Sequence, residues 1–439
     1  MKKLKDSNLA ILINSPDLFF LNSIEQQRLF IVVEKQSLLE ILARKNFKKD
    51  KIITYAYRRP YKLEESVSLA TDNLLTKTDF TQQLLNKGIK YFFVPYRSSK
   101  KIEKWSKATG IKLIVTPLAF QNKLENKKYF DNFLKKHQIA SPPRIAGNKI
   151  KKKQSYVIQE AKVSNFLRTN FFPNGNKLAS YIRKKNICLK KYVIREYLPG
   201  VSVGVSLFID TEGNYFFSAL RRQCFIYQNN FPQKFLGIQW LKTDFFPVAV
   251  TKKINQQLKK LSQDLIRNKF FGVANVDLII YNNYPYILEC NPRLSMSMPQ
   301  AFSLASLTTY KKSWQFFLNI FSQNHQSKIK IAHLPFNNYT GAVLDLENKN
   351  KIIIRNPLSN GVYRLLKGKI SFVSNSIKDF KWQKDIFFLF HELAEGQILG
   401  RGHSLCTIFS NFPLFNSATG TLNDQGKKLY NYFSQALVN

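Results

Sequence analysis

GVANVDLIIYNNYPYILECNPR, residues Gly272–Arg293, is the most informative stretch of the chain. Two runs rich in Val, Ile, Leu and Tyr flank the short segment Asn282-Asn283-Tyr284. That composition is typical of a strand that turns back antiparallel on itself. The sequence therefore predicts a β-hairpin with Asn283 at its midpoint.

The predicted register gathers oxygen-bearing side chains on one face of the hairpin. It places Asp277 opposite Glu289 and Asn275 opposite Asn291, with opposed Cβ atoms about 5 Å apart. Side chains two residues apart share a face, so Glu289 and Asn291 are expected to point the same way. Oxygen ligands at this density suit Mg²⁺ better than zinc or copper. The alternative is a surface hairpin with solvated acids, and a slip of one residue would scatter the cluster.

The same stretch resembles the end of the nucleotide-binding half of the ATP-grasp ligases. Members of that family carry an acid, a turn, and then a strand ending Glu-x-Asn-Pro-Arg, as this chain does with Asp277 and Glu289–Arg293. Three further landmarks of the family follow in order upstream of the hairpin. They are Asn126-Lys127 with the later LKKHQIASPP, the hinge-like YVIREYLPG of Tyr192–Gly200, and Arg222-Gln223 with Leu236-Gly237.

The resemblance implies an ATP-grasp fold of mixed α/β and α+β class with three domains. Residues 1–115 would form an N-terminal α/β domain with a parallel sheet. Residues 116–310 would form the nucleotide-binding domain, with two subdomains and a hinge near 192–200. Residues 311–439 would form a small β-rich C-terminal domain like that of carboxylase-like members, which closes the cleft or forms a homodimer contact.

The resemblance also assigns residues to the phosphates of ATP. Lys127, in the first turn of a helix over 126–138, would reach them as a flexible point charge, with Lys128 or a solvated lysine as alternatives. Gln159 stands where the family has a second phosphate-binding lysine. Because glutamine adds no charge, either a nearby lysine or arginine compensates or ATP binds differently. Residues 163–169 replace a glycine-rich flap and contain no glycine.

The adenosine part of ATP is assigned to the hinge-like segment. Glu196 would accept a hydrogen bond at the adenine edge, while backbone groups of Tyr197 and Leu198 read the purine. Ser202 replaces the glutamate that often binds the ribose hydroxyls. The resemblance therefore implies an adenine site but leaves the ribose contact open.

The implied chemistry is activation of a carboxylate by ATP with Mg²⁺ or Mn²⁺, giving an acyl phosphate that an amine captures. The metal would be held by Asp277, Glu289 and Asn291. Arg293 would neutralise phosphate oxygens and the tetrahedral oxyanion. Arg222, or Arg221, would grip a substrate carboxylate. The implied partners are a small-molecule or peptide carboxylate and an amine.

Two other functions stay open on the sequence. Carboxylation through carboxyphosphate agrees with the resemblance of the C-terminal part to carboxylases. A module that binds a nucleotide or polyanion without turnover is favoured by Gln159 and by the flap without glycine.

Length and composition set the outer limits of the prediction. A chain of 439 residues with 44% apolar residues exceeds what one hydrophobic core organises, so two or three domains are expected. The net charge of +40 would attract nucleic acid or anionic membrane. However, the lysines are spread along the chain together with Asn, Ile, Phe and Tyr, which points to genome composition. No nucleic-acid motif is present, so no specific nucleic-acid partner is expected.

The sequence gives no sign of membrane insertion or of a cysteine-based site. No apolar run approaches the roughly 18 residues of a membrane span. The apolar run near the start is interrupted at Asn14–Asp17, which argues against a signal peptide and for a cytoplasmic protein. The four cysteines are isolated, with no C-x-x-C pair, so neither disulfides nor a zinc site is expected. Cys290 is expected to face the core.

Periodicity predicts the remaining elements. Strand-like and helix-like segments alternate over the first 116 residues, which favours a parallel sheet flanked by helices. No G-x-G-x-x-G turn follows these strands, so a Rossmann-type dinucleotide site is not expected. A helix over 250–266 has apolar residues at helical spacing and would brace the hairpin from behind. Short strands at 339–344, 361–366, 369–373 and within 399–409 precede a closing helix at 424–437.

Overall fold

The structure is a computed structural model of the whole chain. It describes residues 8–12, 28–35, 38–55, 75, 77–94, 97–162, 169–295, 341–348, 350–355, 357–376, 379–380, 385–391, 393 and 395–437. Residues 163–168 of the flap expected at 163–169, and the predicted domain boundary at 310, lie outside these residues. Among the helices that the structure describes, none has both the length and the apolar character needed to cross a membrane.

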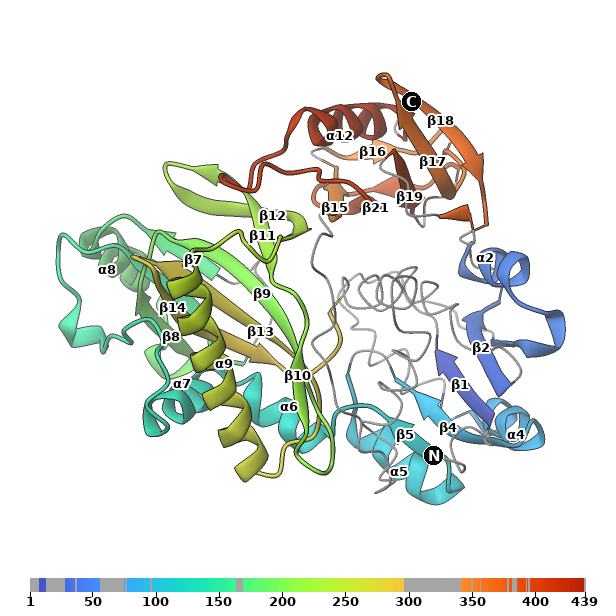
Figure 1. The fold of residues 1–439 in the computed structure, drawn as a ribbon, viewed down its shortest axis with the longest axis horizontal. Coiled ribbons are helices and arrows are strands. Elements are labelled where there is room, and N and C mark those ends of the chain that lie inside the picture. The colour runs from blue at the N-terminus through green and yellow to red at the C-terminus, as the bar shows by residue number, and fades with distance from the viewer. Residues whose placement is uncertain are drawn as a thin grey trace.

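The N-terminal part is a parallel five-stranded sheet with the strand order β3-β2-β1-β4-β5 (Figure 1). Its strands are β1 (Asn8–Leu12), β2 (Leu29–Glu34), β3 (Ile52–Tyr55), β4 (Ile89–Phe93) and β5 (Lys112–Ile114). The helices around it are α2 (Leu38–Asn46), α4 (Thr78–Asn86) and α5 (Lys100–Thr109). The predicted parallel sheet is confirmed. Sequence reasoning missed β1, because it interpreted these residues only as a short apolar lead.

An eleven-stranded sheet forms the rest of the main framework. Its strands between residues 201 and 291 are β9 (Val201–Ile209), β10 (Tyr215–Phe217), β11 (Arg221–Gln228), β12 (Phe231–Trp240), β13 (Gly272–Tyr281) and β14 (Tyr284–Asn291). β13 lies between β9 and β14, and both neighbours run antiparallel to it. The predicted hairpin is therefore the edge of a larger sheet, which it joins through the pairing of β13 with β9.

The hairpin has the predicted register where the acids lie. Asp277 pairs with Glu289, and Asn275 pairs with Asn291. The turn is shorter than predicted: Tyr281 pairs with Tyr284, and Asn282 and Asn283 alone form it, both with positive φ. That geometry is a type I′ turn, which asparagine tolerates well. A bulge between Asp277 and Leu278 shifts the strand pairing by one residue, so that Asp277 lies opposite Glu289 as predicted.

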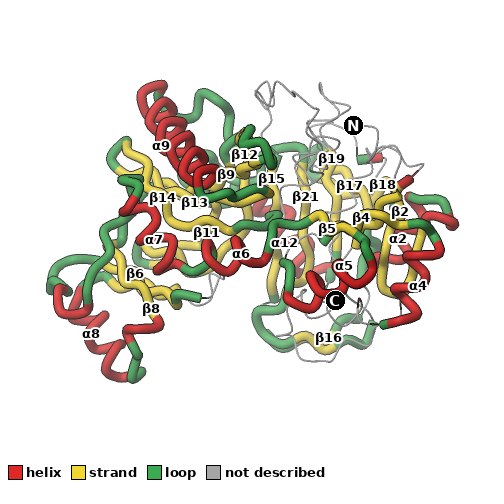
Figure 2. The backbone as a smooth tube through the Cα atoms, turned by 90° about the horizontal axis from the view of Figure 1, so that it is seen from below, coloured by secondary structure: helices red, strands yellow, loops and turns green. Residues whose placement is uncertain are grey.

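A small three-stranded sheet lies across from the hairpin. Its strand order is β7-β6-β8, with β6 (Tyr156–Glu160), β7 (Thr169–Phe172) and β8 (Tyr192–Glu196). The helix α8 (Gly175–Lys184) packs on it. The helices α7 (Lys127–Lys136) and α6 (Leu118–Leu124) contact each other (Figure 2), and both contact β14. Asn126 caps α7 by accepting hydrogen bonds from the backbone of Lys128 and Tyr129.

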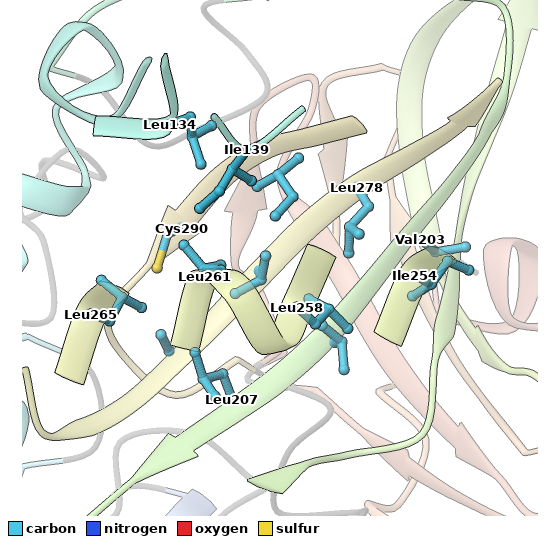
Figure 3. Packing of buried hydrophobic residues seen from close by; sticks show 14 of the residues in the cluster. Leu134, Ile139, Val203, Leu207, Ile254, Leu258, Leu261, Leu265, Leu278 and Cys290 are labelled. Carbon is cyan, nitrogen blue, oxygen red and sulfur yellow. The ribbon is translucent and has the colours of Figure 1, made fainter. Parts of the chain in front are cut away.

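The helix α9 (Val248–Arg267) packs against the face of the hairpin opposite the acids. Its buried positions include Val250, Ile254, Leu258, Leu261 and Leu265, which is the predicted stripe. Figure 3 shows these leucines next to the strand residues of the same core, among them the fully buried Cys290. The bracing helix and the inward-facing cysteine are confirmed.

The C-terminal part extends the same large sheet. β15 (Ala342–Glu347) pairs with β12, and β21, β19, β17 and β18 follow in order. Their bounds are β17 (Gly361–Leu366), β18 (Lys369–Ser374), β19 (Ile386–Phe390) and β21 (Ser404–Ser410). β16 (Ile352–Ile353) pairs with β20 (Ile398–Leu399), and α12 (Asp424–Ala436) closes the chain. Sequence reasoning missed β19, and it placed β15 a few residues too early.

Candidate active site

Two carboxylates and an amide meet on the inner face of the hairpin. Asp277 and Asn291 are 6% and 7% exposed. The Asn291 amide donates to Glu289 Oε1 at 3.0 Å and to Asp277 Oδ2 at 3.4 Å. Asn275 and Gln223 each donate to Asp277 Oδ1, at 2.8 and 2.9 Å. The structure therefore brings together the three side chains assigned to a metal.

The carboxylate pair is electrostatically strained without a counter-ion. Burial, followed by the nearby charge of Glu289, raises the pKa of Asp277 well above its usual range. Burial is also the largest single influence on Glu289 and raises its pKa, but Lys127, the hydrogen bonds from Asn291 and Asp277, and Arg195 together lower the pKa of that carboxyl. The pKa values of the two neighbouring carboxyls therefore move in opposite directions, as expected for a close acidic pair.

Lys127 reaches the acids from the first turn of α7. Its side chain is 4% exposed, and its Nζ lies 3.4 Å from Glu289 Oε2. The alternative residue, Lys128, points away, since its Nζ contacts the carbonyls of Leu189 and Lys190. The capped start of α7 therefore selects Lys127 as the lysine of the site.

A cavity of about 210 Å³ opens between the hairpin and the small sheet. Asp277 and Glu289 lie at one end of it, and the hinge residues Glu196, Tyr197 and Leu198 lie along its wall. Gln159 and Ser202 also line it. Except for Asn291, Arg222 and Arg293, all the residues assigned to the site from the sequence face this cavity.

Arg195 supplies a second cation to the cavity wall. Its Nη1 donates to Gln159 Oε1 at 2.8 Å, and its Nη2 pairs with Asp131 at 2.5 Å. Gln159 in turn donates to Thr169 Oγ1 at 3.1 Å. Arg195 is 4% exposed, and no described residue accepts a hydrogen bond from its Nε. The guanidinium therefore stands beside the glutamine that replaces the expected lysine.

The hinge leaves only part of its backbone available. The Tyr197 N–H donates to the Ser155 carbonyl at 2.9 Å, and the Leu198 carbonyl accepts from Gly200 at 2.9 Å. The Leu198 N–H has no backbone partner among the described residues. A purine edge in this cavity would therefore meet the Leu198 N–H, and the Tyr197 N–H is excluded from that role.

Aromatic rings form part of the cavity wall and adjoin the hinge. Phe225, Tyr227 and Phe235 of β11 and β12 line the cavity, as does Phe171 of β7. The ring of Phe231 stacks at a tilt on Tyr197, with centroids 4.9 Å apart, and Tyr197 donates to the Asn230 carbonyl at 3.0 Å. The tip of the β11–β12 hairpin therefore joins the hinge. A flat apolar base is the kind of group that such a wall accepts.

The structure places the two predicted substrate arginines differently. Arg293 follows the end of β14, two residues after Asn291, and its Nε pairs with Glu125 Oε1 at 3.2 Å. Arg222 points to the other face of β11, where its Nη1 donates to the carbonyls of Ser417 and Ala418 at 2.5 and 3.0 Å. The structure thus gives Arg222 a packing contact with the C-terminal part and does not bring it to the cavity.

Arg221 takes the inward position on the same strand. Its guanidinium donates to Ser206 and Asn275 and lies 5.2 Å from the ring centre of Trp240. Burial lowers its pKa to about 10, against the opposing charge of Asp277. Arg221 and Gln223 share a face because strand side chains alternate, so Arg222 must face away.

The donor set fits a divalent cation. Among the residues that the structure describes, no three His, Cys, Asp or Glu side chains cluster as metal ligands, so the third oxygen at this face is the amide of Asn291. Carboxylate and amide oxygens without sulfur or imidazole suit Mg²⁺ or Mn²⁺. Asp277 is buried and faces the partly buried Glu289, and a bound cation would relieve the close approach of their charges.

Three contributors escaped sequence reasoning: Arg195, Gln223 and the aromatic wall. Arg195 carried a weak signal, because it is a charged residue within the otherwise apolar strand at Tyr192–Glu196. Gln223 belongs to the Arg222-Gln223 motif, and strand alternation places its side chain on the same face as that of Arg221. The aromatic wall had no local signal, since it depends on where the β11–β12 hairpin folds.

Comparison with known proteins agrees with this geometry. Residues 124–297 match the ATP-grasp domain family. The sequence matches no curated protein. The fold is also similar to that of several solved structures. Their sequences are only distantly similar to this chain, so the likeness concerns the fold alone.

Three solved structures illustrate the likeness. The biotin carboxylase domain of the Hydrogenobacter thermophilus 2-oxoglutarate carboxylase, solved with MgADP and bicarbonate, is 10% identical with a TM-score of 0.61, covering 92% of this chain and 86% of that one. The L-amino acid ligase from Bacillus licheniformis is 12% identical with a TM-score of 0.59, covering 97% and 96%. The N5-carboxyaminoimidazole synthetase from Staphylococcus aureus is 13% identical with a TM-score of 0.51, covering 78% and 82%.

Proposed function

From the match of residues 124–297 to the ATP-grasp domain family, we propose that the chain is an ATP-dependent carboxylate–amine ligase. It would form an amide or peptide-like bond and release ADP and phosphate. The observation that carries the proposal is the facing Asp277–Glu289 pair at a cavity that is also lined by Lys127 and the hinge. A nucleotide placed along the cavity would point its phosphates at these groups.

The cavity has a binding partner for each part of ATP. The base would lie between the aromatic wall and the hinge, where the Leu198 N–H is available. The phosphates would run toward Lys127 and Arg195, the two cationic side chains among the described residues of the lining. Arg195 thus compensates for the charge that Gln159 lacks.

Asp277, Glu289 and Asn291 would hold Mg²⁺ or Mn²⁺, which would supply positive charge that lowers the barrier to phosphoryl transfer. The chain's own residues then need only position the reactants. Lys127 would hold a phosphate oxygen beside Glu289. The γ-phosphoryl group passes to a substrate carboxylate oxygen, giving an acyl phosphate and ADP. The amine nitrogen then attacks the acyl carbon, phosphate leaves, and Arg293 would stabilise the oxyanion formed between these steps.

A second candidate reaction is carboxylation through carboxyphosphate. It is supported by the C-terminal sheet extension and by the likeness to a biotin carboxylase domain over most of both chains. The likeness to an L-amino acid ligase over 97% of this chain supports ligation equally well on fold. The two reactions differ in the acceptor and not in the nucleotide site.

The decisive test measures release of ADP from MgATP with the full chain. Amino acids and other amines would be screened in pairs, and bicarbonate separately. Ligation predicts ADP release that requires an added amine, while carboxylation predicts a requirement for bicarbonate. Binding of MgATP with no turnover in any condition would contradict both and favour a nucleotide-binding module.

Matched variants make the assay specific. Asp277→Ala and Glu289→Ala should abolish release of ADP, because the metal face loses a ligand. Asp385→Asn removes a carboxylate that pairs with Arg364 on the C-terminal part, and it should leave turnover unchanged. Equal loss in all three variants would point to damage to the fold instead of the site.

A further inference from the structure

Two arginines from distant parts of the sequence share one buried carboxylate beside the metal face. Glu125, at the end of α6, has a side chain that is 5% exposed. Its Oε2 lies 3.1 Å from Arg97 Nη2, and its Oε1 lies 3.2 Å from Arg293 Nε. Arg97 belongs to the N-terminal part, after β4, and Arg293 follows the hairpin. The carboxylate therefore holds the two guanidinium groups side by side.

A second bridge, one helical turn away, fixes the same two segments. Gln121 of α6 is fully buried and accepts a hydrogen bond from the Ser98 N–H at 2.9 Å. Its Nε2 donates to the Pro292 carbonyl at 3.3 Å. Since Gln121 and Glu125 are four residues apart, they lie on one face of the helix. The views of Figures 1 and 2 place α6 between the hairpin side and the N-terminal sheet.

The cluster keeps an excess of positive charge and unused donors. Two guanidinium groups on one carboxylate leave a net charge of +1. The side chains of Arg97 and Arg293 are 41% and 26% exposed, so both can meet a ligand. Glu125 is their acceptor among the described residues, and each fork retains further N–H groups. The Ser98 hydroxyl, 2% exposed, also has no partner in the described part of the chain.

The cluster adjoins the metal face through short backbone links. Arg293 donates its N–H to the Asn291 carbonyl at 2.8 Å, and Lys127 begins α7 two residues after Glu125. A group bound by both arginines would therefore sit next to the end of the nucleotide cavity where the acids lie. Planar guanidinium forks match the geometry of carboxylate and phosphate oxygens.

We propose that Arg97 and Arg293, held together by Glu125, form the site for the anionic group that is phosphorylated. The ligand class is a carboxylate or the acyl phosphate made from it, and the N-terminal part supplies Arg97 to complete the site. Glu125 is a positioning residue that orients both guanidinium groups. This inference rests on the proposed function and adds to it a residue for the carboxylate substrate.

The test measures binding of inorganic phosphate, an oxyanion probe, to the full chain saturated with MgADP. Isothermal titration calorimetry at fixed ionic strength would compare the wild type with Arg97→Gln. Arg44→Gln is the matched control, because Arg44 pairs with the mostly buried Glu40 on α2, away from the cavity. It removes the same charge from the N-terminal part.

Arg97→Gln should weaken phosphate binding about tenfold or more, which is the usual effect of losing a charged hydrogen bond. Arg44→Gln should leave it unchanged, and MgADP affinity should be the same in all three proteins. Arg97→Lys keeps the charge without the fork and should give an intermediate affinity. This variant also serves if Arg97→Gln does not fold.

The possible negative results distinguish an error in the proposed function from an error in the arginine site. Absence of MgADP binding to the wild type would overturn the proposed function itself. Normal MgADP binding with no phosphate binding, or with equal phosphate affinity in wild type and Arg97→Gln, would overturn the arginine site alone. In the last case the phosphate occupies the γ-phosphate position beside Lys127 and Arg195.

Discussion

At the scale of single residues, the carboxylate pair sets function against stability. Asp277 and Glu289 face each other in a buried site that contains several hydrogen-bond donors and one lysine contact. Like charges at opposed strand positions destabilise a sheet unless something neutralises them. A cation held between the two carboxylates, as we propose, would offset this cost.

Asp277→Asn should separate these two effects. Removing one acid relieves the like-charge contact, so the free energy of unfolding in EDTA should rise by about 1 kcal/mol. The same change should abolish ADP release with MgATP, because a metal ligand is lost. Urea denaturation and the ADP assay check the two parts. A variant that is less stable and still active would contradict the assignment.

Asp345 predicts a pH dependence outside the site. Burial raises its pKa from 3.8 to about 6, against a hydrogen bond from Thr407. Glu347 raises it further, and Lys234 lowers it. Because the folded state holds the proton more tightly, Asp345 removes stability as pH rises from about 4 to about 6. Below that window the contribution is fully present, and above it the loss is complete.

Asp345→Asn should flatten the stability profile across that window. The gain at pH 7 has an upper bound of about 3 kcal/mol, from roughly two pKa units. Urea denaturation at pH 4 to 8 measures it. Asp385→Asn is a control, since it removes a half-exposed carboxylate paired with Arg364 and should keep the slope. An unchanged slope in Asp345→Asn would show that other groups cause it.

At the scale of elements, the β13–β14 turn positions the metal face. Asn282 and Asn283 have φ values of +49° and +57°, which most residues avoid. The bulge after Asp277 then shifts the pairing by one residue, so that the acids oppose each other. The turn and the bulge together fix the register that the site requires.

Substitutions at Asn283 should report on that turn. Asn283→Gly should be neutral or slightly stabilising, because glycine adopts positive φ without strain. Asn283→Val should cost about 1 to 2 kcal/mol, since a β-branched residue is strained there. Thermal unfolding and the Mg²⁺ dependence of ADP release would both follow the order Gly, Asn, Val. Equal behaviour of the Gly and Val variants would argue against the type I′ turn.

At the scale of the whole molecule, one sheet joins the nucleotide-binding and C-terminal parts. β12 pairs with β15 through Gly237–Leu344, Ile238–Val343 and Gln239–Ala342. The contact of Arg222 with the carbonyls of Ser417 and Ala418 adds a second link. The predicted boundaries at 115 and 310 stay predictions. The continuous sheet suggests that the C-terminal part depends on β12 for its stability.

Gly237→Ala should break this link. Gly237 has a φ of +145°, and a Cβ at this position would lie 1.9 Å from the Val343 carbonyl oxygen. The backbones must separate, so we expect a loss of several kcal/mol. Hydrogen exchange in β15 should accelerate while α9 stays protected. Gly396→Ala is a control with positive φ and no nearby atom, and it should cost about 1 kcal/mol. Uniform exchange in Gly237→Ala would contradict the separation.

The sequence alone was sufficient for features that depend on neighbouring residues. The hairpin pairing of Asp277 with Glu289, the inward Cys290 and the apolar stripe of α9 follow from strand and helix periodicity. The resemblance of the sequence to the ATP-grasp ligases predicted the fold. Local periodicity carries this information because it fixes which side chains share a face.

Only the tertiary structure decided which face meets the cavity and which distant residues share it. The alternation in β11 allowed either Arg221 or Arg222 to face inward, and pairing with β9 and β12 selected Arg221. Arg195 beside Gln159, and Arg97 beside Glu125, bring together residues that are 36 and 28 positions apart. Such contacts arise from the packing of whole elements, and no local rule of the chain encodes them.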